Sequence, residues 1–356
     1  MGAFGSRSSV GLDLGSHTLK VAELVQAGDT LRIERVGMVR TPPGAVSKGV
    51  AVNADALAQA IRTLLQDTGI GSTRIATALG GQAAVIREVT VPAMPDADLA
   101  QAAAFEAERY LPAGAGEVRC EYRVVGRTAD NGQLELLLVA TEKGLIDRHL
   151  APLAMAGLTP DLMEVTPFSM ARAVAPGAGH DGHPMMYVDL GAESADVLIV
   201  DDGRVRLART VPVGGDALTQ VIAQALGLDT SAAEALKVER GRLVLDEEQP
   251  GEAGAAAVHR AILPVVTRLG TELRRSLDFY RARLHGRPVS AVVLTGGTAK
   301  VGNLAPFLSS ALGLPVEIGD PFQACDVGAG VPAASRAEVA PVMAVAVGLA
   351  LRGARA

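Results

Sequence analysis

The sequence predicts an α/β protein built from two similar lobes that face a cleft. Strand patterns are followed by helix patterns in both halves of the 356 residues. A repeat supports duplication, because Asp13-Leu14-Gly15-Ser16 recurs as Asp189-Leu190-Gly191-Ala192, 176 residues later (189 minus 13). A hydrophobic content of 49% is enough for two or three buried cores and argues against a disordered chain.

The first half opens with a predicted antiparallel β-meander. Residues 10–14, 20–24 and 31–39 read as three short strands, and a Thr-Pro-Pro-Gly segment breaks the pattern after them. Asn53 can cap a helix over residues 54–67, which precedes a buried strand over residues 75–79. Strands followed by a helix indicate a mixed α/β layer.

Between residues 87 and 165 the pattern changes to a compact α+β subdomain inserted in the first lobe. It contains a strand over 87–91, a helix through 105–110, strands over 121–127 and 135–141, and a second helix. Asp130-Asn131-Gly132 predicts the hairpin turn between the last two strands.

After a Gly- and Pro-rich segment at residues 175–184, the meander recurs and leads into a second lobe. Helices are expected over 217–226, 232–240, 258–284, 303–312 and 339–351, with strands over 289–294 and 316–318. The predicted division is a first-lobe core (1–86 and 166–183), the inserted subdomain (87–165), a second-lobe core (184–213 and 286–356) and a helical, mixed subdomain (214–285).

Charge and composition exclude several classes of protein. A net charge of −6 and the lack of tryptophan argue against a nucleic-acid partner. The longest apolar stretch, residues 339–351, is shorter than the ~20 residues that span a bilayer, and no signal peptide is evident, so a cytoplasmic protein is expected. Cys120 and Cys325 lack disulfide or metal-ligand spacing, and His180-Asp181-Gly182-His183 is expected to be a loop without metal.

The turn after the first strand has the composition of a phosphate cradle. Glycine lets backbone N–H groups approach a phosphate, serine can donate to it, lysine adds positive charge, and aspartate can hold Mg²⁺ through water. A simple hairpin is the alternative for one such turn, and a solvent-facing ring is the alternative for the histidine. The candidates are Gly15, Ser16, His17, Thr18 and Lys20 for phosphate and Asp13 for the metal.

The repeat favours the phosphate interpretation, because the second lobe supplies a matching turn. Two hairpins could then hold one nucleotide from opposite sides. Further glycines follow a strand and open helices, where backbone can approach a ligand. Glu234 and Lys237 lie three apart on one helix, facing either a ribose or base or the solvent. The second-lobe candidates are Asp189 for the metal and Gly191, Ala192, Gly214, Gly215, Glu234, Lys237, Gly296, Gly297 and Thr298 for the nucleotide.

No P-loop, HExxH, GxSxG or strand-linked GxGxxG motif is present, and the ordered set of motifs resembles the actin/Hsp70/sugar-kinase superfamily. The place of the inserted subdomain resembles the FtsA branch. Within that branch the chain is similar to the PilM family of type IV pilus proteins, in residues 10–16 with Lys20, in Glu106-Ala107-Glu108-Arg109-Tyr110-Leu111-Pro112 and in residues 275–280. FtsA-like proteins carry a C-terminal amphipathic membrane helix, and the end at Ala356 favours PilM.

This resemblance implies an actin-like two-lobed fold with ATP and Mg²⁺ in the interlobe cleft. It also implies a partner, the N-terminal cytoplasmic segment of the bitopic inner-membrane protein PilN, in a groove between the inserted subdomain and the first lobe. Other inner-membrane pilus components and further copies of the chain are additional expected partners. The protein would then be cytoplasmic and peripheral to the inner membrane through PilN, without inserting into it.

Hydrolysis is expected to be slow or absent. Related proteins place an acidic or amide side chain at the start of the closing helix, commonly before a proline, to orient the attacking water. Here Thr166 precedes Pro167 and Glu164 lies two residues earlier, so these two are the catalytic candidates. Threonine is no general base near neutral pH. The alternatives are a slow ATPase, an ATP-stabilised adaptor, an FtsA-like division tether and, least favoured, a small-molecule kinase.

Overall fold

A computed structural model of the chain describes residues 8–28, 30–112, 116–128, 132–178, 182–245, 253–283 and 286–354. Its two large sheets share one topology, because each extends a three-stranded antiparallel meander with parallel strands beside the first meander strand. The first sheet has the order β10-β6-β1-β2-β3-β16, from β1 (Ser8–Leu14), β2 (Thr18–Ala27), β3 (Thr30–Arg40), β6 (Arg74–Leu79), β10 (Thr159–Val165) and β16 (Asp326–Val327). The second has the order β13-β12-β11-β14-β15, from β11 (Met185–Leu190), β12 (Ala195–Asp201), β13 (Arg204–Val211), β14 (Ala291–Thr295) and β15 (Val316–Ile318). The predicted duplication is confirmed.

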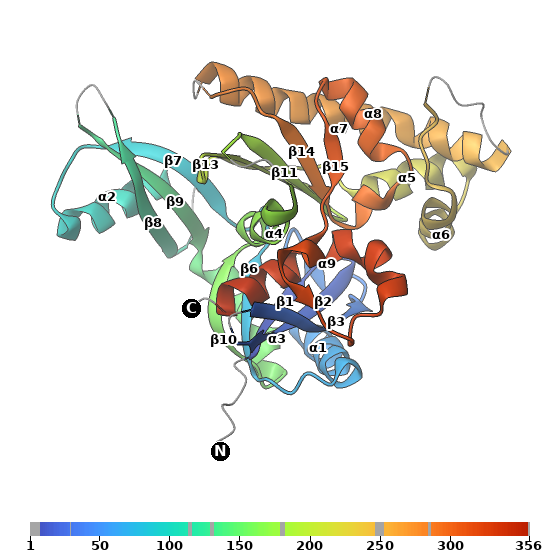
Figure 1. The fold of residues 1–356 in the computed structure, drawn as a ribbon, viewed down its shortest axis with the longest axis horizontal. Coiled ribbons are helices and arrows are strands. Elements are labelled where there is room, and N and C mark those ends of the chain that lie inside the picture. Colours follow the sequence, from blue (N-terminus) through green and yellow to red (C-terminus); the bar gives the residue numbers. More distant parts are fainter. Residues whose placement is uncertain are drawn as a thin grey trace.

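Two helices, α4 (Thr166–Val174) and α9 (Ala333–Ala354), lie between the two sheets (Figure 1). The largest apolar core contains residues of both sheets and of both helices, so the lobes share one interior. The helices cross closely, since a Cβ at Gly348 would lie 1.8 Å from the carbonyl oxygen of Ser169. Only glycine fits at this crossing.

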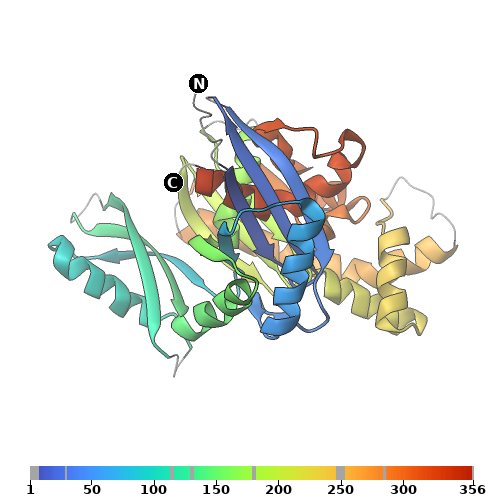
Figure 2. The same ribbon diagram turned by 90° about the horizontal axis from the view of Figure 1, so that it is seen from below.

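The inserted unit is a three-stranded sheet with the order β7-β9-β8, from β7 (Val85–Val91), β8 (Val118–Arg127) and β9 (Leu134–Glu142). Helix α2 (Asp96–Glu108) covers one face through Leu99 and Ala103, which pack on Leu136 and Leu138. The unit projects to one side in both views (Figure 1, Figure 2). The hairpin predicted at Asp130-Asn131-Gly132 falls largely on residues 129–131, outside the described part of the chain.

The predicted boundary of the inserted subdomain is too wide at its C-terminal side. Strand β10 pairs in parallel with β6 of the first sheet, and α3 (Lys143–Met155) packs on α1 (Ala54–Thr68). Strand β10 is a half-exposed edge strand with a bulge, so its sequence lacks a clear alternating pattern. The first lobe also contains the short pair β4 (Val46–Ser47) and β5 (Val50–Ala51).

The C-terminal segment packs on the first sheet, although residues 286–356 were assigned to the second lobe. Strand β16 pairs with β3, and α9 packs on β1 and β2. A helix of small apolar residues carries no sign of which sheet it will cover. Helix α9 is the one described helix long and apolar enough to cross a membrane, yet residues 340–351 are buried almost throughout, so it is a core helix here.

The outer face of the second sheet carries a layer of helices (Figure 1). They are α5 (Gly215–Leu226), α6 (Thr230–Arg240), α7 (Ala253–Arg283) and α8 (Leu304–Leu312). The short 3₁₀ helices are η1 (Ala175–Ala178), η2 (Gly297–Lys300) and η3 (Pro321–Ala324). His180 and Asp181 of the loop expected to hold no metal lie outside the described residues.

Candidate functional site

A cavity of about 540 Å³ lies between the lobes, within the range of small-molecule sites. Both predicted phosphate turns open into it. The predicted residues that line it are Asp13, Gly15, Ser16, His17, Thr18, Lys20, Thr166, Asp189, Gly191, Ala192, Gly215, Glu234, Lys237, Gly296, Gly297 and Thr298. Gly214 and Glu164 do not line it.

The first turn is held by an ion pair across the β1–β2 hairpin. Asp13 and Lys20 face each other in register, with 2.8 Å between Oδ2 and Nζ. A Cβ at Gly15 would lie 2.6 Å from the carbonyl oxygen of Thr18, so the turn is too tight for a side chain there. The hydroxyl of Thr41 donates to the carbonyl of Gly15 at 2.6 Å and fixes the turn on β3.

The second turn gathers the glycine motifs of the second lobe. The carbonyl of Gly191 accepts from the Gly215 N–H at 3.0 Å and from the Thr298 hydroxyl at 2.8 Å. Gly296 has φ +87°, and a Cβ there would lie 2.5 Å from Oδ1 of Asp189. Segments far apart in sequence therefore bring their backbones to one point, as phosphate binding requires.

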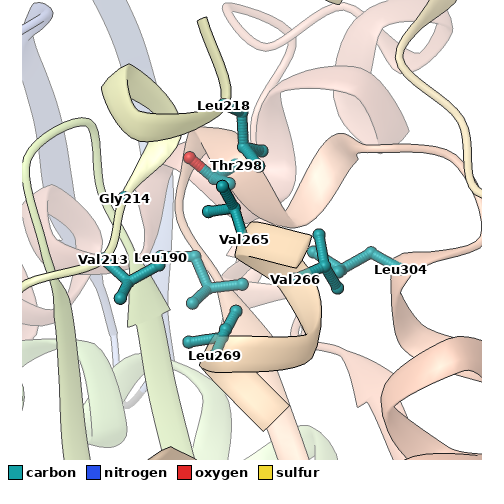
Figure 3. Close-up of a pocket in the computed structure, with 9 residues that line it drawn as sticks. All are labelled: Leu190, Val213, Gly214, Leu218, Val265, Val266, Leu269, Thr298 and Leu304. Atoms are coloured by element: carbon teal, nitrogen blue, oxygen red, sulfur yellow. The ribbon is translucent and has the colours of Figure 1, made fainter. Parts of the chain in front are cut away.

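Gly214 lies behind this turn rather than in the cavity. A Cβ there would lie 2.3 Å from the carbonyl oxygen of Ala192, so its role is close packing. Figure 3 shows it at the edge of a small apolar void of about 10 Å³ together with Leu190, Val266 and Leu269. With an apolar lining, a void of this size stays dry.

The two turns also contact each other across the cleft. The Ser16 hydroxyl donates to Oε2 of Glu193 at 2.7 Å, and the same oxygen accepts from the N–H of Lys48 at 2.7 Å. His17 Nε2 lies 3.9 Å from Oε1 of Glu234. Donors that could face a phosphate are therefore partnered by second-lobe carboxylates in this conformation.

Asp189 is a buried acid of the cavity with a raised pKa. Burial, and then the nearby Asp196, raises its pKa to about 7, although Lys20 opposes the change. Its Oδ1 accepts from the Thr295 hydroxyl at 3.2 Å. Because burial disfavours the carboxylate, a cation placed beside Asp189 would restore the charged form.

The described residues hold no group of three or more His, Cys, Asp or Glu side chains that could cage a metal. Mg²⁺ does not need such a cage, because it keeps several waters and commonly binds one or two carboxylates together with substrate phosphates. The buried Asp189 and the hairpin Asp13 fit that pattern, so the residues present suit a magnesium ion carried in by a phosphate ligand.

Glu234 and Lys237 face the cavity wall rather than the solvent. Lys237 Nζ lies 2.6 Å from Glu234 Oε2 and donates to the carbonyl of Gly215 at 3.1 Å. The Thr219 hydroxyl donates to Glu234 at 2.5 Å. Burial alone would raise the pKa of Glu234, but the hydrogen bonds from Lys237 and Thr219 outweigh it and lower the pKa.

Thr166 lies in the cavity beside an acid that the sequence analysis missed. Its hydroxyl donates to Oδ2 of Asp196 at 2.7 Å, Thr210 donates to Oδ1 at 2.7 Å, and the Gly81 N–H donates to Oδ2 at 3.2 Å. Burial raises the pKa of Asp196, and the three donors oppose that rise. The internal repeat could have identified Asp196, because this residue stands 176 positions after Lys20. It lies opposite Asp189 in the β11–β12 register, as Lys20 lies opposite Asp13 in the β1–β2 register.

Glu164 is a structural ion-pair partner. Arg172 donates to it through both Nη atoms, at 2.5 and 2.9 Å, and the Ser169 hydroxyl donates at 2.6 Å. With these partners and no place in the cavity lining, it cannot orient a water at the site. Cavity residues beyond those predicted include Lys48, Gly81, Gln82, Glu193, Asp196, Asp216, Val238, Gly241, Lys300, Glu338 and Val339.

Comparisons with known proteins agree with this geometry. The cell division protein FtsA of Pseudomonas aeruginosa is 26% identical over 88% of this chain and 83% of its own length. MreB5 of Spiroplasma citri, solved with ADP, matches 96% of this chain and 94% of its own with a TM-score of 0.54 at 13% identity, a likeness of fold. The fold is therefore the predicted actin-like, two-lobed α/β fold.

The nearer matches identify the family. A solved PilM–PilN type IV pilus biogenesis complex matches 97% of this chain and 98% of its own, with a TM-score of 0.85 at 30% identity. The family model described as type IV pilus assembly protein PilM matches residues 11–354. The chain therefore belongs to the PilM family of type IV pilus assembly proteins.

Proposed function

We propose that this protein is an ATP-binding adaptor of type IV pilus assembly that holds PilN at the inner membrane. The observation that carries the proposal is the interlobe cavity, into which two duplicated turns bring Lys20, Asp13 and Asp189 together with closely packed glycines. ATP would place its phosphates between the turns. Glu234 and Lys237, on the α6 side, would face the ribose or base.

Each turn has a separate task in this proposal. Lys20 would exchange part of its contact with Asp13 for a phosphate oxygen, and Ser16 would exchange Glu193 for another. Mg²⁺ would neutralise phosphate charge beside Asp189 and Asp13. Because nucleotide contacts come from both lobes, binding fixes the angle between them.

Hydrolysis is proposed to be slow or absent. Thr166 is no base, and Asp196, the carboxylate beside it, already accepts three hydrogen bonds. Glu164 is committed to Arg172. ATP would then act chiefly as a structural ligand.

The proposed partner is the cytoplasmic N-terminal segment of PilN, since the matched structure is a PilM–PilN complex. We place it between the inserted sheet and the first lobe, where Leu137 of β9, Leu162 of β10 and Phe168 of α4 are only partly buried against the shared core. Such half-buried apolar groups suit an apolar peptide segment. The protein would be cytoplasmic and reach the membrane through PilN; other pilus components and self-association are further proposed contacts.

Calorimetric titration tests the nucleotide site with a matched pair of lysine variants. Lys20→Ala removes a cavity lysine and leaves Asp13 unpaired, whereas Lys143→Ala removes an exposed lysine paired with Glu117. Loss of a charged hydrogen bond of ~1.5–3 kcal/mol predicts a roughly 10- to 100-fold weaker Kd for Mg·ATP in Lys20→Ala and no change in Lys143→Ala. Equal affinities in all three proteins would contradict the proposed site.

A second titration tests the partner. Wild-type protein loaded with Mg·ATP is titrated with a synthetic peptide of the N-terminal segment of PilN from the same organism. Saturable one-to-one binding supports the adaptor role. No binding at high peptide concentration defeats it and favours the FtsA-like division tether.

A further inference from the structure

The inserted unit belongs to the first lobe in sequence but also touches the second lobe along its edge strand. Strands β7 and β13 lie side by side (Figure 1). A bulge interrupts the alternation of β13 between Val205 and Leu207, so Arg206 is the extra residue of that strand opposite β12. We call this contact the β7–β13 seam, made by Arg87 and Glu88 of β7 with the preceding Gly81, and by Arg206, Ala208 and Thr210 of β13.

The seam begins at the cavity. Gly81 lies in the segment between β6 and β7, and its N–H donates to Asp196. A Cβ at Gly81 would lie 2.0 Å from Asp196 Oδ1 and 2.4 Å from the Thr210 hydroxyl. The backbone of the first lobe is therefore in direct contact with side chains of the second lobe at this point. Thr166, which lines the cavity, lies beside this contact.

Polar contacts continue along the strands away from the cavity. Arg87 Nη1 donates to the carbonyl of Ala208 at 3.4 Å, and Arg206 Nη1 lies 3.4 Å from Glu88 Oε1. The Arg87 guanidinium also stacks on the ring of Tyr110, 5.7 Å from its centroid. The Glu-Ala-Glu-Arg-Tyr-Leu-Pro segment, which the nucleotide site does not use, is thereby attached to the seam.

The middle of the seam is incompletely satisfied. Among the residues that the structure describes, buried Glu88 Oε2 has no hydrogen-bond partner, and Oε1 lies 3.4 Å from Arg206 Nη1. A buried polar atom without a partner is costly, so a small shift of β13 that improved this pairing would be favourable.

We propose that the β7–β13 seam couples nucleotide in the cleft to the position of the inserted sheet, and so to PilN binding; this inference rests on the proposed function. Nucleotide that changes the lobe angle moves Asp196 of β12 and, through its hydrogen bond, Thr210 of β13. The same strand then moves Arg206 and Ala208 against β7. Glu88 and Arg206 act as positioning residues in this coupling, because they form an ion pair across the seam and neither lines the cavity.

Two matched double variants test the coupling in the full-length protein. Glu88→Ala with Arg206→Ala removes both partners of the seam pair and leaves no buried charge unpaired. Arg119→Ala with Glu121→Ala removes an exposed pair on β8, the free edge of the same sheet, with 2.6 Å between its atoms. Hydrogen exchange is measured with and without Mg·ATP, and the PilN-peptide Kd is measured in both states.

In the wild type, Mg·ATP is expected to change exchange in residues 85–91 and 204–211 as well as at the phosphate turns. The ratio of the two peptide Kd values is expected to be at least threefold. In the seam variant the exchange response of β7 should disappear and the ratio of the two peptide Kd values should fall toward one. The Kd for ATP should stay within about twofold of wild type. The β8 variant should behave as wild type.

Exchange that changes only at the phosphate turns, or a seam variant that keeps the wild-type ratio, would overturn the coupling while leaving the proposed function standing. Absence of ATP binding would defeat the proposed function, and the coupling with it. If ATP binds but the peptide does not, only the partner assignment fails, and the exchange of β7 still decides whether the seam responds.

Discussion

Buried His149 is expected to make the free energy of unfolding fall as the pH falls. Replacing this histidine should remove that part of the pH dependence. The ring is 1% exposed on α3, and burial lowers its pKa to about 4. Nε2 lies 2.9 Å from the Thr77 hydroxyl, which donates to the carbonyl of Leu12 at 3.1 Å, so Nε2 is the protonated nitrogen. Nδ1 is then a buried acceptor that has no hydrogen-bond partner within the described part of the chain.

The sign and size of the effect follow from linkage. The unfolded chain takes up a proton near pH 6.5 while folded His149 does not, so its contribution to stability is lost as the pH falls from 6.5 toward 4. Between pH 7.5 and 5.5 the loss is about 1.4 kcal/mol for these two pKa values. The opposite contribution of Asp189, whose raised pKa favours the protonated folded state, is common to both proteins and cancels in their difference.

His149→Leu is therefore compared with wild type by urea unfolding at both pH values, without nucleotide. Far-ultraviolet circular dichroism is the signal, because the chain has no tryptophan. The free energy of unfolding of the variant minus that of wild type should rise by about 1.4 kcal/mol on going to pH 5.5. His183→Gln, at an exposed histidine, is the control. A difference that stays constant within ~0.3 kcal/mol would refute the assignment of a buried neutral ring.

Three further predictions follow from packing and burial. Asp189→Asn should raise the melting temperature of the nucleotide-free protein more at pH 8 than at pH 5, because burial raises the pKa of Asp189 to about 7, and it should weaken Mg·ATP binding by calorimetry. Gly348→Ala should destabilise by more than ~2 kcal/mol in urea unfolding, since its Cβ would meet the α4 backbone at 1.8 Å, whereas Gly71→Ala enters open space and should be nearly neutral. Glu164→Ala should lower stability by roughly 2 kcal/mol by leaving the partly buried Arg172 without its carboxylate partner, yet leave the Kd for ATP unchanged.

Much of the site could be predicted because its signals are local. The turns around Gly15 and Gly191 need small residues at fixed spacing, and the repeat relates them directly. Asp196 was missed, although applying the same 176-residue offset to Lys20 points to it. Glu164 was misplaced because sequence proximity to Thr166 does not show that β10 turns the carboxylate toward Arg172.

The fold was predictable in its repeated parts and less so where packing partners are distant. Strand patterns and caps such as Asn53 gave the meanders and α1, whose first turn is capped as expected, with 3.1 Å from the Asn53 side chain to the Ala56 N–H. Strands β10 and β16 pair with the first sheet, and α9 packs on it, through contacts between residues more than 80 positions apart in sequence. A local sequence pattern does not reveal contacts of this range.

The position of α9 has a consequence for how the chain folds as it is synthesised. The first strand, β1, is covered by this helix, and a Cβ at Gly11 would lie 2.1 Å from the carbonyl oxygen of Ala346. The first sheet to be made therefore stays open on one face until residues 333–354 leave the ribosome. Contacts of such long range form late and slow folding, and an uncovered apolar sheet is prone to aggregate meanwhile. A chain truncated before α9 should therefore be insoluble when it is expressed.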